Sequence, residues 1–165
     1  MAERLSAKIW IGGTIKRSIV SDLIDKINEQ EVAAEYGDAT LNIENEEELL
    51  RYLGPNLTLE FCDEEARWGE FSDLEFFLTK NQIPFLRQSE GGDELMPEVS
   101  YLTDSMDCPL TEVTDTDGNK VYSKDDLQSI LNLIEQGDTI INVINTLKRM
   151  LQDIPDVPRF EIVED

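Results

Sequence analysis

The sequence predicts a single compact α+β domain, with a mixed or antiparallel sheet, helices on one face and a C-terminal helical hairpin. Short β-prone runs alternate with longer segments whose apolar residues recur every three or four positions. Hydrophobic residues make up 40% of the 165 residues, which is enough for one core. The segments Val20–Leu23 and Phe71–Leu74 also match at an offset of 51 residues. Two strand–helix–strand units in tandem are typical of a ferredoxin-like sheet.

The first unit begins with a strand and a helix. Lys8–Ile11 is a run of β-branched and aromatic residues, and the pair Gly12-Gly13 closes it with a tight turn. A glycine pair before a helix also fits a phosphate cradle, but no GxGxxG or Walker lysine pattern accompanies it, so a plain turn is favoured. Ile15–Gln30 places its apolar residues on one helical face, and Val32–Tyr36 predicts a second strand.

A short acidic helix separates the two units. Thr40–Ile43 is a candidate strand, and Asn45 then caps a helix predicted over Glu46–Leu53. Three glutamates fill its first turn, where negative charge is favoured by the helix dipole. The pair Gly54-Pro55 ends the helix.

The second unit, Thr58–Gln88, is the clearest folding unit in the chain. Its first residues alternate apolar and polar, which predicts a strand with one buried face. The acidic run Asp63–Glu65 predicts a turn, and Ser72 then caps an amphipathic helix. Pro84 ends the helix and opens the returning strand.

The C-terminal part predicts a pair of helices. Asp125–Gln136 and Asp138–Leu151 each carry an apolar stripe, and Gly137 stops the first of them. We therefore divide the chain into an α+β core, residues 1–122, and a helix pair with an acidic tail, residues 123–165, packed on the same domain. Ile140 and Ile141 widen the apolar surface of the pair. Packing on the core is the simpler expectation, and a homodimer contact is the alternative.

Composition excludes several kinds of site. The chain has no histidine, so His-based triads, His general bases and His-ligated metals are excluded. Its two cysteines, Cys62 and Cys108, are too few for a disulfide scaffold or a thiolate zinc site, and reduced thiols are favoured over a single bridge. No apolar run approaches a transmembrane helix, and no signal peptide is evident, so we expect a cytoplasmic protein that makes no membrane contact.

One segment, Asp115–Asp126, resembles an EF-hand calcium loop. The candidate metal ligands are Asp115, Asp117, Asn119 and Asp126. The sequence departs from the pattern at two positions, because Lys120 replaces the glycine of the sharp turn and Asp126 replaces the bidentate glutamate. A β-turn followed by a helix cap explains the same residues. Calcium is therefore a secondary expectation, and no other cofactor is expected.

Carboxylates are common enough to suggest a hydrolase as another alternative. Glu60 and Asp63–Glu65 lie near the end of a predicted strand, where catalytic carboxylates are often found. A carboxylate-based or divalent-metal-dependent hydrolase would need a defined pair with split pKa values. More than one residue in five is acidic, so such pairs also arise by chance.

The net charge of −22, from 36 acidic and 14 basic residues, gives the leading functional hypothesis. It disfavours direct binding to nucleic acid, which needs Lys and Arg, and favours a basic protein as partner. We expect a non-enzymatic interaction protein, whose carboxylates imitate duplex phosphates in the basic cleft of a nucleic-acid-binding protein. DNA mimics of this kind inhibit restriction or CRISPR nucleases in mobile elements. The carboxylates expected to form one surface band are those of Glu46, Glu47, Glu48, Asp63, Glu64, Glu65, Asp93, Glu94 and Glu98.

Overall fold

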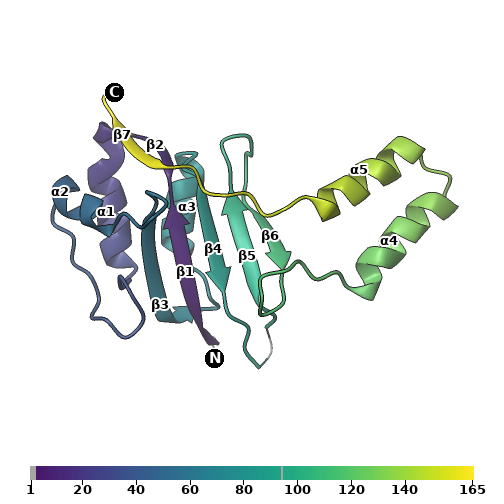
Figure 1. Ribbon diagram of the computed structural model, residues 1–165, viewed down its shortest axis with the longest axis horizontal. Coiled ribbons are helices and arrows are strands. Elements are labelled where there is room, and N and C mark those ends of the chain that lie inside the picture. The colour runs from purple at the N-terminus through teal and green to yellow at the C-terminus, as the bar shows by residue number, and fades with distance from the viewer. Residues whose placement is uncertain (1–2, 94) are drawn as a thin grey trace.

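The structure, a computed structural model, describes residues 3–93 and 95–165 and confirms the α+β class (Figure 1). Within these residues the strands are β1 Arg4–Ile11, β2 Gly13–Lys16, β3 Leu59–Arg67, β4 Phe85–Ser89, β5 Glu98–Leu102, β6 Leu110–Val113 and β7 Phe160–Val163. The helices are α1 Val20–Glu29, α2 Glu46–Leu49, α3 Ser72–Lys80, α4 Lys124–Glu135 and α5 Ile140–Leu151, with short 3₁₀ turns at Arg17–Ile19 and Leu50–Tyr52.

The main sheet is antiparallel and follows the order β3-β1-β4-β5-β6. Because β3 and β4 both run antiparallel to β1, they are parallel to each other, and α3 crosses from one to the other. On the outer side of β3, Ala33 forms an isolated antiparallel bridge with Cys62. The segment after α1 therefore runs parallel to β1, with β3 between them. These two interleaved units give the strand order of a ferredoxin-like sheet, extended by the β5–β6 hairpin.

One face of this sheet forms the core. The inward residues of β1 alternate with exposed or half-buried ones and are fully buried at Ala7, Ile9 and Ile11. They join the apolar faces of α1 and α3, which pack against each other. The buried residues of these helices are Val20, Leu23, Ile24 and Ile27 in α1, and Leu74 and Leu78 in α3. Burial of these helical stripes is the main force that holds both units together.

The C-terminal segment crosses the opposite face and joins the start of the chain. Figure 1 shows this segment in yellow in front of the sheet, with α3 behind it. β7 pairs in parallel with β2, and the amide of Gly13 donates to the carbonyl of Arg159 at 3.0 Å. A Cβ at Gly12 would lie 1.8 Å from the carbonyl oxygen of Pro158. The Gly12-Gly13 pair is therefore a place of close backbone approach between the two ends of the fold.

Several predicted boundaries differ from the observed elements. The predicted strand Val32–Tyr36 contributes only the bridge at Ala33, and Thr40–Ile43 forms no strand. The acidic run Asp63–Glu65 was predicted as a turn, which is wrong, because β3 continues through it to Arg67 and pairs with β1 across a register shift. An edge strand tolerates such charged residues because one side of it faces water.

Candidate functional site

The candidate site is an acidic hollow at the outer edge of β3. It has a volume of about 520 Å³ and lies between β3 and the loop that follows α1. Among the described residues, seven carboxylates and two arginines line it: Glu29, Glu31, Glu35, Asp38, Asp63, Glu64 and Glu65, with Arg4 and Arg67. We call this set the acidic hollow. The hollow lies beside β3, which forms the left edge of the main sheet in Figure 1.

Local structure explains why these carboxylates gather there. α1 ends at Glu29, and Glu31 adopts a left-handed φ of 56°, so the chain turns back toward the sheet. Ala33 and Cys62 then exchange two backbone hydrogen bonds, of 2.8 and 2.9 Å. Beyond this bridge the loop carries its acidic residues past the edge of β3. The hollow is thus formed by a strand and a loop that is fixed to it by hydrogen bonds.

The carboxylates of the hollow are largely free of internal cations. Among the described residues, Glu29 pairs with Lys26, whereas the other six carboxylates form no ion pair with Lys or Arg. Arg4 instead donates to the backbone carbonyl of Glu65 at 2.9 Å, and the amide of Glu65 donates to Asp63 Oδ1 at 2.8 Å. The negative charge of the hollow is therefore open to an external cation.

Tyr36 also lines the hollow, and Lys8 of β1 lies beside its ring. The Lys8 ammonium lies 4.8 Å from the centroid of the Tyr36 ring, in a cation–π contact. Burial, with nearby carboxylates such as Glu90, raises the pKa of Tyr36 to about 12. The phenol therefore stays neutral at physiological pH and presents an apolar ring with a polar tip beside the carboxylates.

The other carboxylates predicted to bind a partner do not line the hollow. On α2, Glu46 pairs with Arg17 at 3.2 Å, Glu47 pairs with Arg51 at 3.4 Å, and Glu48 accepts a hydrogen bond from the amide of Glu44. α2 therefore uses its glutamates largely for internal contacts.

The predicted carboxylates after β4 are also placed elsewhere. Asp93 lies in the loop before β5, where its amide donates to Glu3 Oε1 at 2.8 Å. Glu98 pairs with the buried Arg87 at 2.6 Å. Glu94 lies outside the described residues. Of the three predicted groups, the structure brings only Asp63, Glu64 and Glu65 into the hollow.

The sequence-based prediction missed the other half of the site, namely Glu29, Glu31, Glu35 and Asp38. Their signal was their density, four carboxylates within ten residues. The predicted strand Val32–Tyr36 contains only one of them, Glu35, so the four carboxylates did not stand out as one group. Only the return of the loop to Cys62 brings them together.

The loop that resembles a calcium site forms a tight turn that begins at Asp115. Asp115 Oδ1 accepts from the amides of Asp117 and Asn119 at 2.9 and 2.8 Å, so this carboxylate organises a tight turn at Gly118. Hydrogen bonds, first that from the Asn119 side chain, lower the pKa of Asp115. Calcium binding stays a prediction, and calorimetric heat at millimolar calcium that disappears in Asp115→Ala would support it.

The far end of that loop serves as a helix cap. Ser123 and Asp126 form a reciprocal capping box at the start of α4, and the hydrogen bond from Ser123 lowers the pKa of Asp126. Among residues 3–93 and 95–165, no group of three or more Asp, Glu or Cys side chains is arranged to hold a metal ion. The structure thus offers a local structural role for both terminal aspartates of the loop.

Glu75 has a raised pKa, as a catalytic acid would require, but it lies away from the hollow. Burial raises its pKa, while Arg87 opposes the shift. The Glu75 carboxylate lies 3.0 Å from Arg87 Nε, although the angle at that nitrogen falls outside hydrogen-bond geometry. The Arg87 guanidinium also donates to the carbonyl of Gly69 at 2.8 Å and pairs with Glu98. This buried cluster ties α3 to β4 and β5, which is a structural role.

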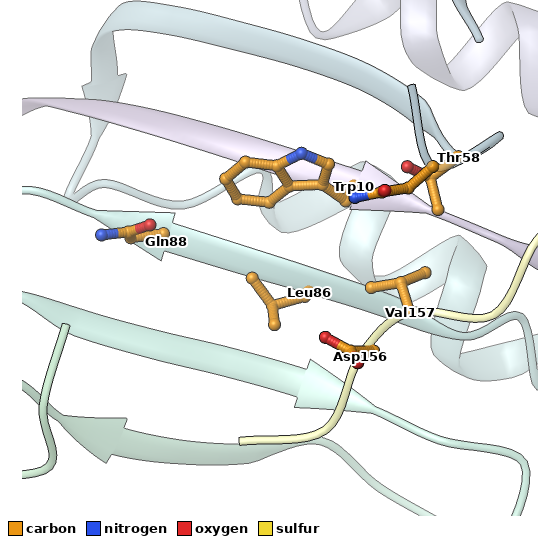
Figure 2. Close-up of a pocket in the computed structure, with 7 residues that line it drawn as sticks. Trp10, Thr58, Leu86, Gln88, Asp156 and Val157 are labelled. Atoms are coloured by element: carbon orange, nitrogen blue, oxygen red, sulfur yellow. The ribbon is translucent and has the colours of Figure 1, made fainter. Parts of the chain in front are cut away.

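A second cavity lies beside the C-terminal segment and is shown in Figure 2. Its volume is about 470 Å³, and Trp10, Leu86 and Gln88 from the sheet face Asp156 and Val157 of the crossing segment. The hydroxyl of Thr58 is buried at its border and has no hydrogen-bond partner within the protein. The cavity combines one aromatic face with a few polar groups.

Comparison with protein-family models, curated proteins and solved structures gives no match to this chain. Within the part of the chain that the structure describes, no helix is both long and apolar enough to span a bilayer. The two cysteines are both free, with Cys62 buried and Cys108 exposed.

Proposed function

We propose that this protein is a non-enzymatic interaction protein that binds a basic protein surface through the acidic hollow. The observation that carries the proposal is the grouping of seven carboxylates around one hollow, six of which have no ion pair with a Lys or Arg of the described chain. A basic partner gains electrostatic attraction there without first displacing an internal cation. The net charge of −22 extends this attraction beyond the contact and speeds association.

The partner class that fits best is a nucleic-acid-binding protein with a basic cleft. Such a cleft has evolved to hold phosphates, and a row of carboxylates on an ordered strand and loop offers similar charges at fixed positions. On this proposal the protein is a DNA-mimic inhibitor, and restriction or CRISPR-type nucleases are the natural targets. It would act in the cytoplasm, where these nucleases work.

The test compares two variants that change the net charge equally. The hollow variant is Glu35→Gln, Asp38→Asn and Glu64→Gln, all at exposed positions. The control is Asp104→Asn, Asp107→Asn and Asp153→Asn, also exposed and outside the hollow. Each immobilised protein is incubated with an extract of the cells that produce it, at about 50 mM and about 500 mM salt, because salt screens charge pairing.

We expect one partner to be captured at low salt by the native protein and the control, and to be lost in the hollow variant and at high salt. Equal capture by both variants would contradict the role of the hollow. Addition of a short DNA duplex to the captured pair then tests mimicry, because a duplex that occupies the same cleft releases the protein. If the captured partner stays bound in excess duplex, the protein binds a basic partner but does not occupy its DNA-binding cleft, and it is then not a DNA mimic.

A further inference from the structure

A different surface, far from the acidic hollow, carries the largest group of exposed aliphatic side chains. α4 and α5 form a helical hairpin that stands out beyond β6, at the right of Figure 1. Within the described residues, α4 has one buried side chain, Ile130, and α5 has none. The hydroxyl of Tyr122 donates to the carbonyl of Met150 and anchors the end of α5. The outer faces of both helices remain uncovered.

The exposed side chains follow the spacing of a helix bundle. On α4, Leu127, Leu131 and Ile134 are each 50% to 55% exposed, at intervals of four and three residues. On α5 the intervals are four, three and four residues, and the exposure ranges from 40% to 80%, at Ile140, Ile144, Leu147 and Leu151. This alternation is the heptad pattern of a helix that packs along a second helix. We call these two rows the aliphatic stripes.

The two stripes do not cover each other, so another helical surface must meet them. With about 100 Å² of apolar area per fully exposed aliphatic side chain, the stripes and Ile141 expose on the order of 500 Å² in each copy. Two such surfaces together bury about 1,000 Å², the area at which specific interfaces begin. The area exposed on one copy is that of the largest apolar patch on a typical monomer, and such patches are often binding sites.

Charge favours a second copy of the chain as the occupant. Two chains of −22 repel each other, so a self-contact must form where the negative charge is lowest. Residues 124–151 carry three basic and four acidic side chains and are therefore almost neutral. Within them, α4 has two more acidic than basic residues, whereas α5 has Lys148 and Arg149 and no acidic residue.

We infer that this protein forms a two-fold homodimer in which the α4–α5 hairpins of two copies pack into a four-helix bundle. In this arrangement the aliphatic stripes cover each other, and α4 of one copy faces α5 of the other. The negative α4 of each copy then lies against the positive α5 of the other copy. The surface is therefore self-complementary, as a two-fold contact requires.

The dimer leaves the acidic hollow free. Figure 1 places the hairpin at one end of the molecule and the β3 edge at the other. The two hollows would therefore lie at opposite ends of the dimer, available to two basic sites. A bivalent partner or two neighbouring partners would bind with avidity.

The experiment measures the mass of the purified full-length protein by sedimentation velocity between about 1 and 100 µM, the range that resolves micromolar dimers. We expect twice the chain mass of 18.8 kDa in the native protein. Leu131→Asp and Ile144→Asp each place a charge in a stripe and should give monomers. Phe76→Asp is the matched control, because Phe76 is 71% exposed on α3, and it should remain dimeric.

Each variant is also checked by far-UV circular dichroism, so that loss of the dimer is separated from loss of the fold. Should a stripe variant unfold, a mixture of Leu131→Cys and Ile144→Cys, each combined with Cys108→Ala, offers a second test. Because α4 of one copy faces α5 of the other, the dimer predicts rapid disulfide cross-linking between the two variants. A native protein that stays monomeric to 100 µM would overturn the inference, as would a dimer that survives both stripe charges or a mass that grows without limit.

Salt separates this inference from the proposed function. Added salt screens the repulsion between two acidic chains, so the dimer should tighten. Binding of a basic partner at the hollow should weaken under the same conditions. The dimer is measured on the purified protein alone, so either conclusion can fail while the other stands.

Discussion

The buried cation Arg87 offers the sharpest test of how this fold is held together. Its side chain is 3% exposed and lies between Glu75 of α3 and Glu98 of β5. Replacement by methionine, Arg87→Met, keeps an elongated shape but removes the charge. Glu75 is then left as a carboxylate that is 15% exposed and has lost its cation, whereas Glu98 is 29% exposed and can turn toward water.

The expected loss follows from this asymmetry. Removal of one partner from a buried ion pair costs about 3–5 kcal/mol, and the partial exposure of Glu98 places the loss near 3 kcal/mol at pH 7. In a chain of this length each kcal/mol lowers the melting temperature by about 2–4 °C, so we expect a decrease of about 10 °C. Arg67→Met, at an exposed position of β3, removes the same charge and should cost less than about 0.5 kcal/mol.

The pH dependence has a defined sign. Burial raises the folded-state pKa of Glu75, and loss of Arg87 removes an interaction that lowers it. The destabilisation is therefore full above the pKa of the unpaired carboxylate and shrinks as the pH falls through that value, because protonation removes the buried charge. The double variant Glu75→Leu with Arg87→Met removes both charges and should be more stable than Arg87→Met alone.

Urea unfolding followed by circular dichroism at pH 7 and at about pH 5 provides the measurement. A loss below about 1 kcal/mol at pH 7 would show that water reaches Glu75 and that the cluster is not truly buried. A loss that grows on acidification would refute the assigned origin of the effect. Absence of any recovery in the double variant would point to packing of the Arg87 side chain as the main contribution.

Three further outcomes can be checked directly. The pKa of Tyr36 is raised to about 12 although the residue is 38% exposed, so its phenolate absorbance should appear at a higher pH than that of free tyrosine; titration near pH 10 would contradict the raised pKa. Ellman's reagent should modify one thiol in the native protein and two after unfolding, because Cys108 is exposed whereas Cys62 is buried and burial raises its pKa. Gly12→Ala should destabilise the protein by about 1–3 kcal/mol, because the new methyl group would overlap the carbonyl of Pro158. It should also weaken the protection of the β7 amides against hydrogen exchange. Unchanged protection would mean that the segment around Pro158 moves aside without cost.

Local signals predicted some of the regular elements. The α5 helix lies within the predicted Asp138–Leu151, because a glycine stop, a cap and a clear apolar stripe define it. The unit Thr58–Gln88 forms β3, α3 and β4 as expected. The end of β3 after Cys62 was predicted wrongly. Three successive carboxylates are typical of a turn, but here their backbone pairs with β1.

The site depended on contacts between distant residues. Asp63–Glu65 were candidates from their charge, but the loop that completes the hollow is positioned by one bridge between Ala33 and Cys62. Arg87 gave no local signal, because its burial needs carboxylates from α3 and β5 together. Contacts between residues that are far apart in the sequence cannot be predicted from periodicity or composition.

The pairing of β2 with β7 has a consequence for synthesis in the cell. Residues 13–16 emerge early, but their only strand partner, within the described chain, is residues 160–163. At about 5–20 residues per second, the ribosome needs on the order of 10–30 s to translate the segment between them. During that interval β2 is an unpaired β-prone segment that nascent-chain chaperones can bind. The small sheet therefore acts as the last closure of the fold, and translation speed sets the earliest moment at which it can form.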